Sequence, residues 1–228
     1  VLAGSASGYS TAYMNVSMTP QGQAAIIPNG TNVLAVSCHQ TTGGQFIDVG
    51  LSDQVLVANT YTIPTDAVGY WPLDATSGTV ALDATGYGNN GVVNGATWNP
   101  DGEVNGCLNF NGLNNNVQIA NPVNHDFSIV FWVKTTQTAG TGQWWQGTGL
   151  VDGDAHGVAN DFGTALSGGK FGFGVGNPDT TIVSTTSIND GAWHQCVATR
   201  VQSTGAISVY VDGNLQATGI GNTGSLNA

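Results

Sequence analysis

The sequence predicts an all-β protein, and three observations support this class. From Ala206 to Val211 apolar and polar residues alternate, so that Ile207 and Val209 fall on one face and Ser208 on the other. A period of two residues is typical of a strand with one buried face. No segment of ten or more residues shows helical periodicity, and 34 glycines among 228 residues lie with Ser, Thr and Asn between short apolar runs. Many short strands joined by turns indicate a β-sandwich.

The first 58 residues are predicted to be the C-terminal part of a separate, partial β-sandwich. Two apolar runs, at residues 32–39 and 46–51, predict paired strands, and the glycine-containing link at 40–44 predicts their hairpin connection. A unit this short has little hydrophobic core of its own.

Residues 59–67, with the sequence NTYTIPTDA, are predicted to be a linker before the main domain at residues 68–228. Their polar content suits an extended connection, and Pro64 disfavours helical backbone at the residue before it. Further along, residues 98–102 carry a proline at the second position of a turn. Residues 137–149 form a loop rich in Gly and Thr around a pair of tryptophans.

The second half of the main domain contains its clearest strands. Residues 170–175, KFGFGV, alternate Phe with Gly, and these glycines predict the close approach of another sheet or strand. The stretch 193–218 predicts three consecutive antiparallel strands, with breaks at residues 203–205 and at the Asp212-Gly213 turn. This stretch is expected to form the centre of the sandwich.

The motifs of the same stretch also resemble a known family. Trp193-His194, a small apolar run, Arg200 and the strand VYVDG at 209–213 are similar to those of laminin-G-like domains among the concanavalin A-like jelly rolls. Similar segments precede them in family order: GYWPLD at 69–74, DATGYGNNG at 83–91, LNFNG at 108–112 and FSIVFWV at 127–133.

This resemblance implies a concanavalin A-like jelly-roll sandwich of two antiparallel sheets over residues 68–228. The family has at least one further strand, usually with an acidic pair, so the domain is expected to lack its last strand. The segment NVLAVSCHQTTGGQFIDVGL of the first unit resembles the jelly-roll sugar-binding domains found in glycoside hydrolase family 2-like enzymes. For function the resemblance is less specific, because the fold hosts lectins, adhesion modules and glycosidases.

The charge of the chain restricts its partners. Charged residues are 7% of the sequence and the net charge is −11, with Lys134, Lys170 and Arg200 as the three cations. Binding to a nucleic-acid backbone requires several cations, and the same shortage disfavours an anionic membrane surface. The sequence contains no apolar run of about 18 residues that would insert into a membrane. A neutral glycan or a calcium ion remains compatible.

The three cysteines, Cys38, Cys107 and Cys196, have no zinc or redox spacing. One interpretation pairs Cys107 with Cys196 in a disulfide. The other, which we favour, treats all three as small buried apolar residues. In the resembling family, Cys107 and Cys196 stand where an inward-facing aliphatic residue is usual.

The loop of residues 83–91 is the candidate calcium site. Calcium binds oxygens from carboxylates, amides, backbone and water, and the resemblance implies that Asp83, together with one or both of Asn89 and Asn90, occupies the ligand positions. The alternative is an Asx-type turn in which Asp83 binds its own backbone. With one carboxylate, any calcium affinity is expected to be weak.

Trp144 and Trp145 are the candidate carbohydrate-binding residues, with Gln143 and Gln146 beside them. Flat indole faces cover the apolar face of a sugar ring while amides bind its hydroxyls. The alternative is that one tryptophan plugs the edge of the sandwich and the other packs over it. Of the two, Trp145 is expected to be buried and Trp144 exposed.

Two further groups of side chains are assigned structural roles. The acidic cluster of Asp152, Asp154 and Asp161 lacks EF-hand spacing. It is interpreted as a solvated loop, with a second calcium site as the alternative. The resemblance of Trp193-His194 to the family's Trp-His pair implies that the indole lies in the core and that the imidazole bonds nearby backbone.

Catalysis lacks a motif in this sequence. Glycoside hydrolysis uses two carboxylates about 5–10 Å apart, and hydrolases of the resembling fold supply glutamates on one strand, whereas Glu103 is the single glutamate of the chain. The sequence also lacks a G-x-S-x-G elbow, an H-E-x-x-H motif and a phosphate-binding loop. We therefore interpret the chain as non-catalytic.

Together these features predict a secreted carbohydrate-binding or adhesion module that belongs to a larger glycan-processing or cell-surface protein. Its partner would be a neutral glycan or a cell-surface ligand. The alternative is a structural subunit of an extracellular filament or surface layer, in which open sheet edges pair between copies. Low charge and abundant Thr, Asn and Gly suit both interpretations.

Overall fold

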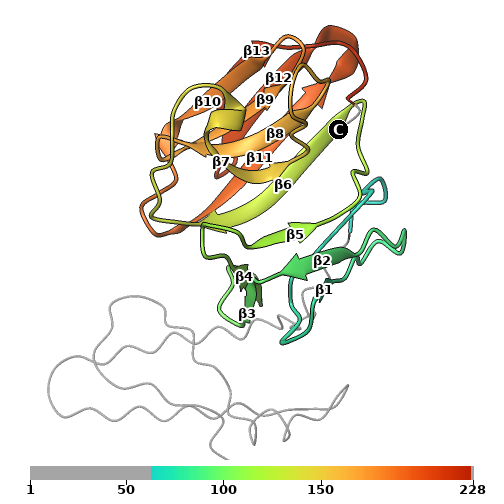
Figure 1. Cartoon of the computed structure of the whole chain (residues 1–228), viewed down its shortest axis with the longest axis vertical. Coiled ribbons are helices and arrows are strands. Elements are labelled where there is room, and N and C mark those ends of the chain that lie inside the picture. Colours follow the sequence, from blue (N-terminus) through green and yellow to red (C-terminus); the bar gives the residue numbers. More distant parts are fainter. Residues whose placement is uncertain (1–62, 227–228) are drawn as a thin grey trace, which may run out of the picture. The chain divides into compact units, whose positions relative to one another are not determined.

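Two four-stranded antiparallel sheets form the main part of the computed structural model, which describes residues 63–226 (Figure 1). The described residues lie within one compact unit. The elements in chain order are β1 (Val80–Ala81), β2 (Gly91–Asn94), β3 (Thr97–Asn99), β4 (Cys107–Asn109), β5 (Asn116–Gln118), β6 (Phe127–Lys134), the 3-10 helix η1 (Trp144–Gln146), β7 (Thr148–Asp152), β8 (Phe162–Ser167), β9 (Lys170–Val175), β10 (Thr180–Ser187), β11 (Trp193–Val201), the 3-10 helix η2 (Gln202–Thr204), β12 (Ala206–Val211) and β13 (Asn214–Ile220).

Several sequence predictions lie outside the described residues. These are the strands predicted within residues 1–58, the start of the predicted linker 59–67, and Cys38. The limits of the predicted domains stay predictions. Neither of the helices in the described part of the chain is long and apolar enough to cross a membrane.

The two large sheets confirm the predicted all-β sandwich. One has the strand order β10-β9-β8-β7 and is called here the β7–β10 sheet; the other has the order β13-β12-β11-β6 and is called the β6/β11–β13 sheet. Strands β11, β12 and β13 pair antiparallel in succession, as the stretch 193–218 predicts. Asp212 (φ 51°) and Gly213 (φ 76°) both have positive φ in the β12–β13 turn, which matches the right-handed twist of the strands it joins.

Side chains from both sheets meet in one core between them. The strict alternation of β12 buries Ile207, Val209 and Val211, which are at most 2% exposed. Aromatic contacts join the sheets: the rings of Phe127 (β6) and Phe162 (β8) lie 5.0 Å apart. This cross-sheet packing supplies the hydrophobic stabilisation that short strands cannot supply alone.

Residues before β6 form two smaller sheets. One has the order β1-β2-β5, and the other pairs β3 with β4. Their core consists of Ala81, Val93 and Leu108, with Trp71 and Trp98 packed against it. The loop of residues 83–91 connects β1 to β2.

A buried arginine fixes the segment after β13. Arg200 is 1% exposed and donates hydrogen bonds to the carbonyl oxygens of His125 (2.6 Å), Asn222 (3.0 Å) and Gly224 (2.5 Å). Leu226 follows and is fully buried in the main core. The guanidinium therefore holds segment 222–226 against the end of the sandwich, because its fixed fork of donors pairs several backbone acceptors.

Two expectations for the start of β11 are wrong. Trp193 is half-buried on the outer face of its sheet, and the Lys134 ammonium lies 6.0 Å from the centre of its ring. The alternation of β11 explains this, because His194, Cys196 and Ala198 face inward and Trp193 therefore faces outward. The His194 imidazole bonds two carboxylates rather than the backbone: Asp212 through Nδ1 (2.8 Å) and Asp190 through Nε2 (3.1 Å).

The cysteines of the described part are both free, so the disulfide interpretation is wrong. Cys196 is fully buried, as favoured, and burial raises the pKa of its thiol to about 12. Cys107 is only half-buried. Cys107 lies on β4, and the small two-stranded sheet to which β4 belongs leaves this residue partly exposed to solvent.

Candidate functional site

The loop between β6 and β7 lies against the outer face of the β7–β10 sheet. Its backbone carbonyls at Thr138 and Gly140 accept hydrogen bonds from Gly169 (2.6 Å) and Gly168 (2.9 Å) in the β8–β9 turn. At the tip of the loop, the N–H of Trp144 donates to Thr181 Oγ1 on β10 (3.0 Å). These contacts place η1 and its two tryptophans over the sheet.

Trp144 is the buried member of the pair, with 2% of its surface exposed. Its indole lies on Gly163 of β8 and Gly174 of β9, which are paired residues. A Cβ atom at Gly174 would fall 2.1 Å from Trp144 Cδ1, and one at Gly163 would fall 2.4 Å from Cζ3. The close approach expected over residues 170–175 is thus present at Gly174, but the neighbour is this indole and not another sheet.

Trp145 is the exposed member, with 48% of its surface exposed, and its Nε1–H donates to Asp179 Oδ2 (3.0 Å). The sequence expectation of an exposed Trp144 and a buried Trp145 is therefore wrong. The physical reason is that the two glycines leave room for Trp144 on the sheet, while the following residue of η1 points elsewhere.

The two glutamines are brought to the same place and are partly engaged. Gln146 Oε1 accepts from the backbone N–H of Gln143 (2.8 Å), and Gln143 Oε1 accepts from Thr181 Oγ1 (2.5 Å). Gln146 is exposed and Gln143 is half-buried. Each amide oxygen accepts one hydrogen bond and keeps a second lone pair, so these side chains offer a ligand their NH₂ donors and that remaining acceptor position.

The surface near Trp145 is acidic. Asp179 lies close enough to Asp161 for their charges to interact, as does Asp154. Burial raises the pKa of Asp161, the Ala155 N–H partly offsets this, and the charges of Asp154 and Asp179 raise it further. Within residues 63–226, no group of three or more His, Cys, Asp or Glu side chains is arranged to hold a metal ion.

Of the three predicted calcium ligands in the loop of residues 83–91, Asn90 meets Asp83 through its side-chain oxygen. Asn89 meets Asp83 only through its backbone N–H, and its side-chain Nδ2 donates to the Val68 carbonyl (2.8 Å). Asp83 Oδ1 accepts from the N–H groups of Tyr70 (3.1 Å) and Thr85 (3.0 Å), and Oδ2 accepts from the Asn89 N–H (3.0 Å). The Thr85 hydroxyl donates to both oxygens. Asn90 Oδ1 accepts from the Asp83 N–H (2.9 Å).

This geometry contains the Asx-type turn of the alternative interpretation, since Asp83 bonds the N–H two residues on. Desolvation alone would raise the pKa of Asp83, but the hydrogen bonds from Thr85, Tyr70 and Asn89 outweigh it and lower the pKa to about 2. Asp83 is therefore a carboxylate at neutral pH. A calcium ion would compete with these donors for the same lone pairs.

Sequence reasoning missed two residues of the Trp145 surface. Asp179, in the β9–β10 turn, orients Trp145, and Thr181, at the start of β10, orients Trp144. Neither residue belongs to a sequence motif. No spacing in the sequence could have connected them to η1, because the contact depends on how the loop folds over the sheet. Glu103, the single glutamate, is exposed in the turn between β3 and β4.

Comparison with solved structures finds distant likenesses. The mouse laminin α1 chain, domains LG4-5, is 17% identical with a TM-score of 0.34, over 46% of this chain and 26% of that one. Domain 4 of AbnA, a GH43 extracellular arabinanase from Geobacillus stearothermophilus solved with arabinotriose, is 18% identical with a TM-score of 0.49, over 63% of this chain and 74% of that one. The binding domain of botulinum neurotoxin serotype G is 18% identical with a TM-score of 0.47, over 64% of this chain and 38% of that one.

Comparison with curated protein sequences finds no match. A family model described as the concanavalin A-like lectin/glucanases superfamily matches residues 110–228, just over half of the chain. The matched residues include β6 to β13 and hence both large sheets. The chain belongs to the concanavalin A-like lectin/glucanase superfamily.

Proposed function

We propose that the domain is a non-catalytic, extracellular carbohydrate-binding module and that Trp145 is its stacking platform. The observation that supports this most directly is a half-exposed indole whose orientation is fixed by a hydrogen bond to Asp179. An aromatic ring held in place loses little conformational entropy when it stacks on a sugar. The module would serve a larger glycan-processing or cell-surface protein.

The surroundings of Trp145 suit a neutral glycan. The amide NH₂ groups of Gln143 and Gln146 supply donors for sugar hydroxyls beside the ring. The carboxylate of Asp179, beside the ring, would accept a hydrogen bond from a sugar hydroxyl and would repel anionic polymers. Glu103 is exposed in a turn, without the second glutamate that the fold's hydrolases use, and the module binds without turnover.

Calorimetric titration with a panel of neutral oligosaccharides tests this proposal. Trp145→Ala should weaken binding about tenfold or more, because the stacked apolar surface is lost. Val158→Ala is the matched control, since Val158 is 91% exposed outside η1 and its removal should leave the affinity unchanged. Equal affinity of Trp145→Ala and the unmodified chain for every sugar that binds would contradict the proposal, as would polysaccharide turnover that disappears in Glu103→Gln.

The second expectation, a structural subunit that assembles through open sheet edges, stays a prediction. Size-exclusion chromatography distinguishes the two. Discrete higher-order species would favour assembly, and a stable monomer that binds sugar would favour the module.

A further inference from the structure

The outer face of the β6/β11–β13 sheet carries a second, differently built surface. On this sheet the inward residues form the core, and their neighbours along each strand face outward. The cross-strand register sorts the outward residues into rows. One row is apolar and consists of Val130, Val197, Tyr210 and Leu215.

The next row carries only hydroxyls. It consists of Ser128, Thr199, Ser208 and Thr218, one from each strand. None of these four hydroxyls bonds another group within residues 63–226. A further apolar row follows, made of Val201, Ala206 and Ile220.

Aromatic residues border the first apolar row. Trp132 is 40% exposed and lies opposite Gln195, next to Trp193 on the diagonal. Rows are about 6.8 Å apart along the strands, and neighbouring strands are about 4.8 Å apart. The result is a flat array in which apolar and hydroxyl rows alternate.

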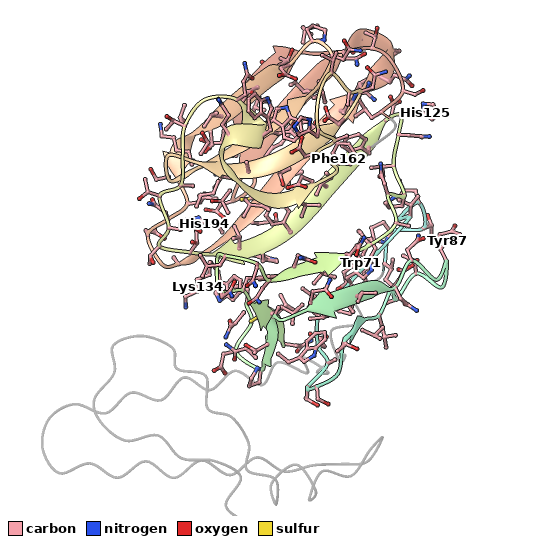
Figure 2. All side chains as sticks on the ribbon, in the orientation of Figure 1. Trp71, Tyr87, His125, Lys134, Phe162 and His194 are labelled. Atoms are coloured by element: carbon pink, nitrogen blue, oxygen red, sulfur yellow. The ribbon has the colours of Figure 1, made fainter. Side chains whose placement is uncertain are left out.

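The charge of this face identifies the class of ligand. The chain has a net charge of −11, yet none of the three rows contains a charged residue. Charges lie at the aromatic border instead: Lys134, labelled in Figure 2, is next to Trp193, and Asp212 pairs with Gln195 through backbone and side-chain hydrogen bonds. The face is therefore matched to an uncharged partner. A protein docked here would bury a row of hydroxyls, each of which costs free energy unless it finds a partner. A polysaccharide has hydroxyls on most ring carbons and apolar ring faces between them, so it can satisfy both kinds of row.

We propose that this face binds the flat side of an extended, neutral polysaccharide, independently of Trp145. Trp145 lies on the outer face of the β7–β10 sheet, on the other side of the core. The module would thus contact glycan on two opposite faces: single chain ends or short sugars at Trp145, and an ordered polymer surface at the rows.

Co-sedimentation of the full chain with microcrystalline cellulose and with chitin tests this. The unmodified chain should adsorb to at least one polymer, and Trp132→Ala should weaken adsorption about tenfold or more through loss of aromatic contact area. Ser128→Glu, which adds a charge to the hydroxyl row without changing an apolar residue, should weaken it similarly. Trp145→Ala should adsorb like the unmodified chain, which separates this face from the Trp145 site.

Leu113→Ala is the matched control, because Leu113 is 90% exposed and lies before β5. Thermal unfolding of each variant checks that it is folded. If Trp132→Ala does not fold, the result for Ser128→Glu decides. The proposal is overturned if the unmodified chain stays in the supernatant with both polymers, or if Ser128→Glu adsorbs like the unmodified chain. It is also overturned if sedimentation velocity shows a dimer that these variants dissociate, because the face would then be a protein contact.

Discussion

Asp83 organises its loop through its two carboxylate oxygens, which accept bonds from three backbone N–H groups and the Thr85 hydroxyl. The same oxygens are the ones a calcium ion would take. The turn and the proposed calcium site therefore depend on the same side chain. A measurement with calcium is needed to distinguish the two roles of Asp83.

We expect Asp83→Ala to abolish any calcium-induced rise in the unfolding temperature, because the loop loses its single carboxylate. Thermal unfolding with calcium chloride or with EDTA measures this. Asp101→Ala is the matched control, since Asp101 is an exposed aspartate in another turn. A calcium effect of equal size in Asp83→Ala would reject the site.

His194 is the residue that links stability to pH near neutrality. Burial alone would lower the pKa of its imidazole, but the hydrogen bonds and charges of Asp212 and Asp190 outweigh it and raise the pKa above its ordinary 6.5. The folded state then holds a proton that the unfolded state has released, so stability falls as pH rises. The contribution is fully present below about pH 6.5 and is lost as the pH passes the raised value.

The unfolding temperature should therefore decrease between about pH 6 and about pH 8, the range around the ordinary histidine pKa. In His194→Gln this decrease should be smaller. Thermal unfolding across that range provides the measurement. His156→Gln is the control, because His156 is exposed in the β7–β8 loop and should keep the full slope. An unchanged slope in His194→Gln would show that the Asp190–His194–Asp212 contacts do not carry the effect.

At the scale of elements, the β7–β10 sheet is shaped by glycines that admit Trp144. We expect Gly174→Ala to destabilise the fold by about 2 kcal/mol or more, because the added methyl meets Trp144 and the Thr180 carbonyl. Chemical denaturation followed by tryptophan fluorescence measures this.

Gly172→Ala provides a matched control on the same strand. Its added methyl would lie 3.5 Å or more from the nearest atoms, which is ordinary contact, so its stability should change little. Equal destabilisation by the two substitutions would mean that loss of glycine from β9, and not contact with Trp144, decides the outcome.

The regular elements could be predicted from the sequence, and the loop that covers them could not. The alternation at Ile207, Val209 and Val211 identifies β12 because one periodic pattern decides both the strand and its buried face. The same rule would have placed Trp193 outward, since His194 and Cys196 face inward. The expectation of a buried Trp193 was wrong because it followed the family resemblance and not the alternation of residues along the strand.

Which of Trp144 and Trp145 is buried could not be predicted from an alternating pattern. The two residues are adjacent in a non-periodic loop, and Gly163 and Gly174, distant in sequence, decide which indole fits against the sheet. The position of Asp179 beside Trp145 is likewise a tertiary contact. Local sequence patterns carry no information on such pairings.

At the scale of the whole domain, the sandwich is the framework that carries the two proposed glycan-binding faces. Arg200 and Leu226 close one end of the core, and the Phe127–Phe162 contact joins the sheets. The net charge of −11 disfavours polyanions as ligands. Both proposals therefore assign a neutral glycan as the ligand.

The measurement that tests the account most directly is the change in tryptophan fluorescence when a neutral oligosaccharide that binds is added to Trp144→Phe and to Trp145→Phe. Trp144→Phe should keep the sugar-dependent change, because its indole is buried against the sheet, and Trp145→Phe should lose it. A change that survives in Trp145→Phe and disappears in Trp144→Phe would contradict the assignment of the exposed indole as the binding platform.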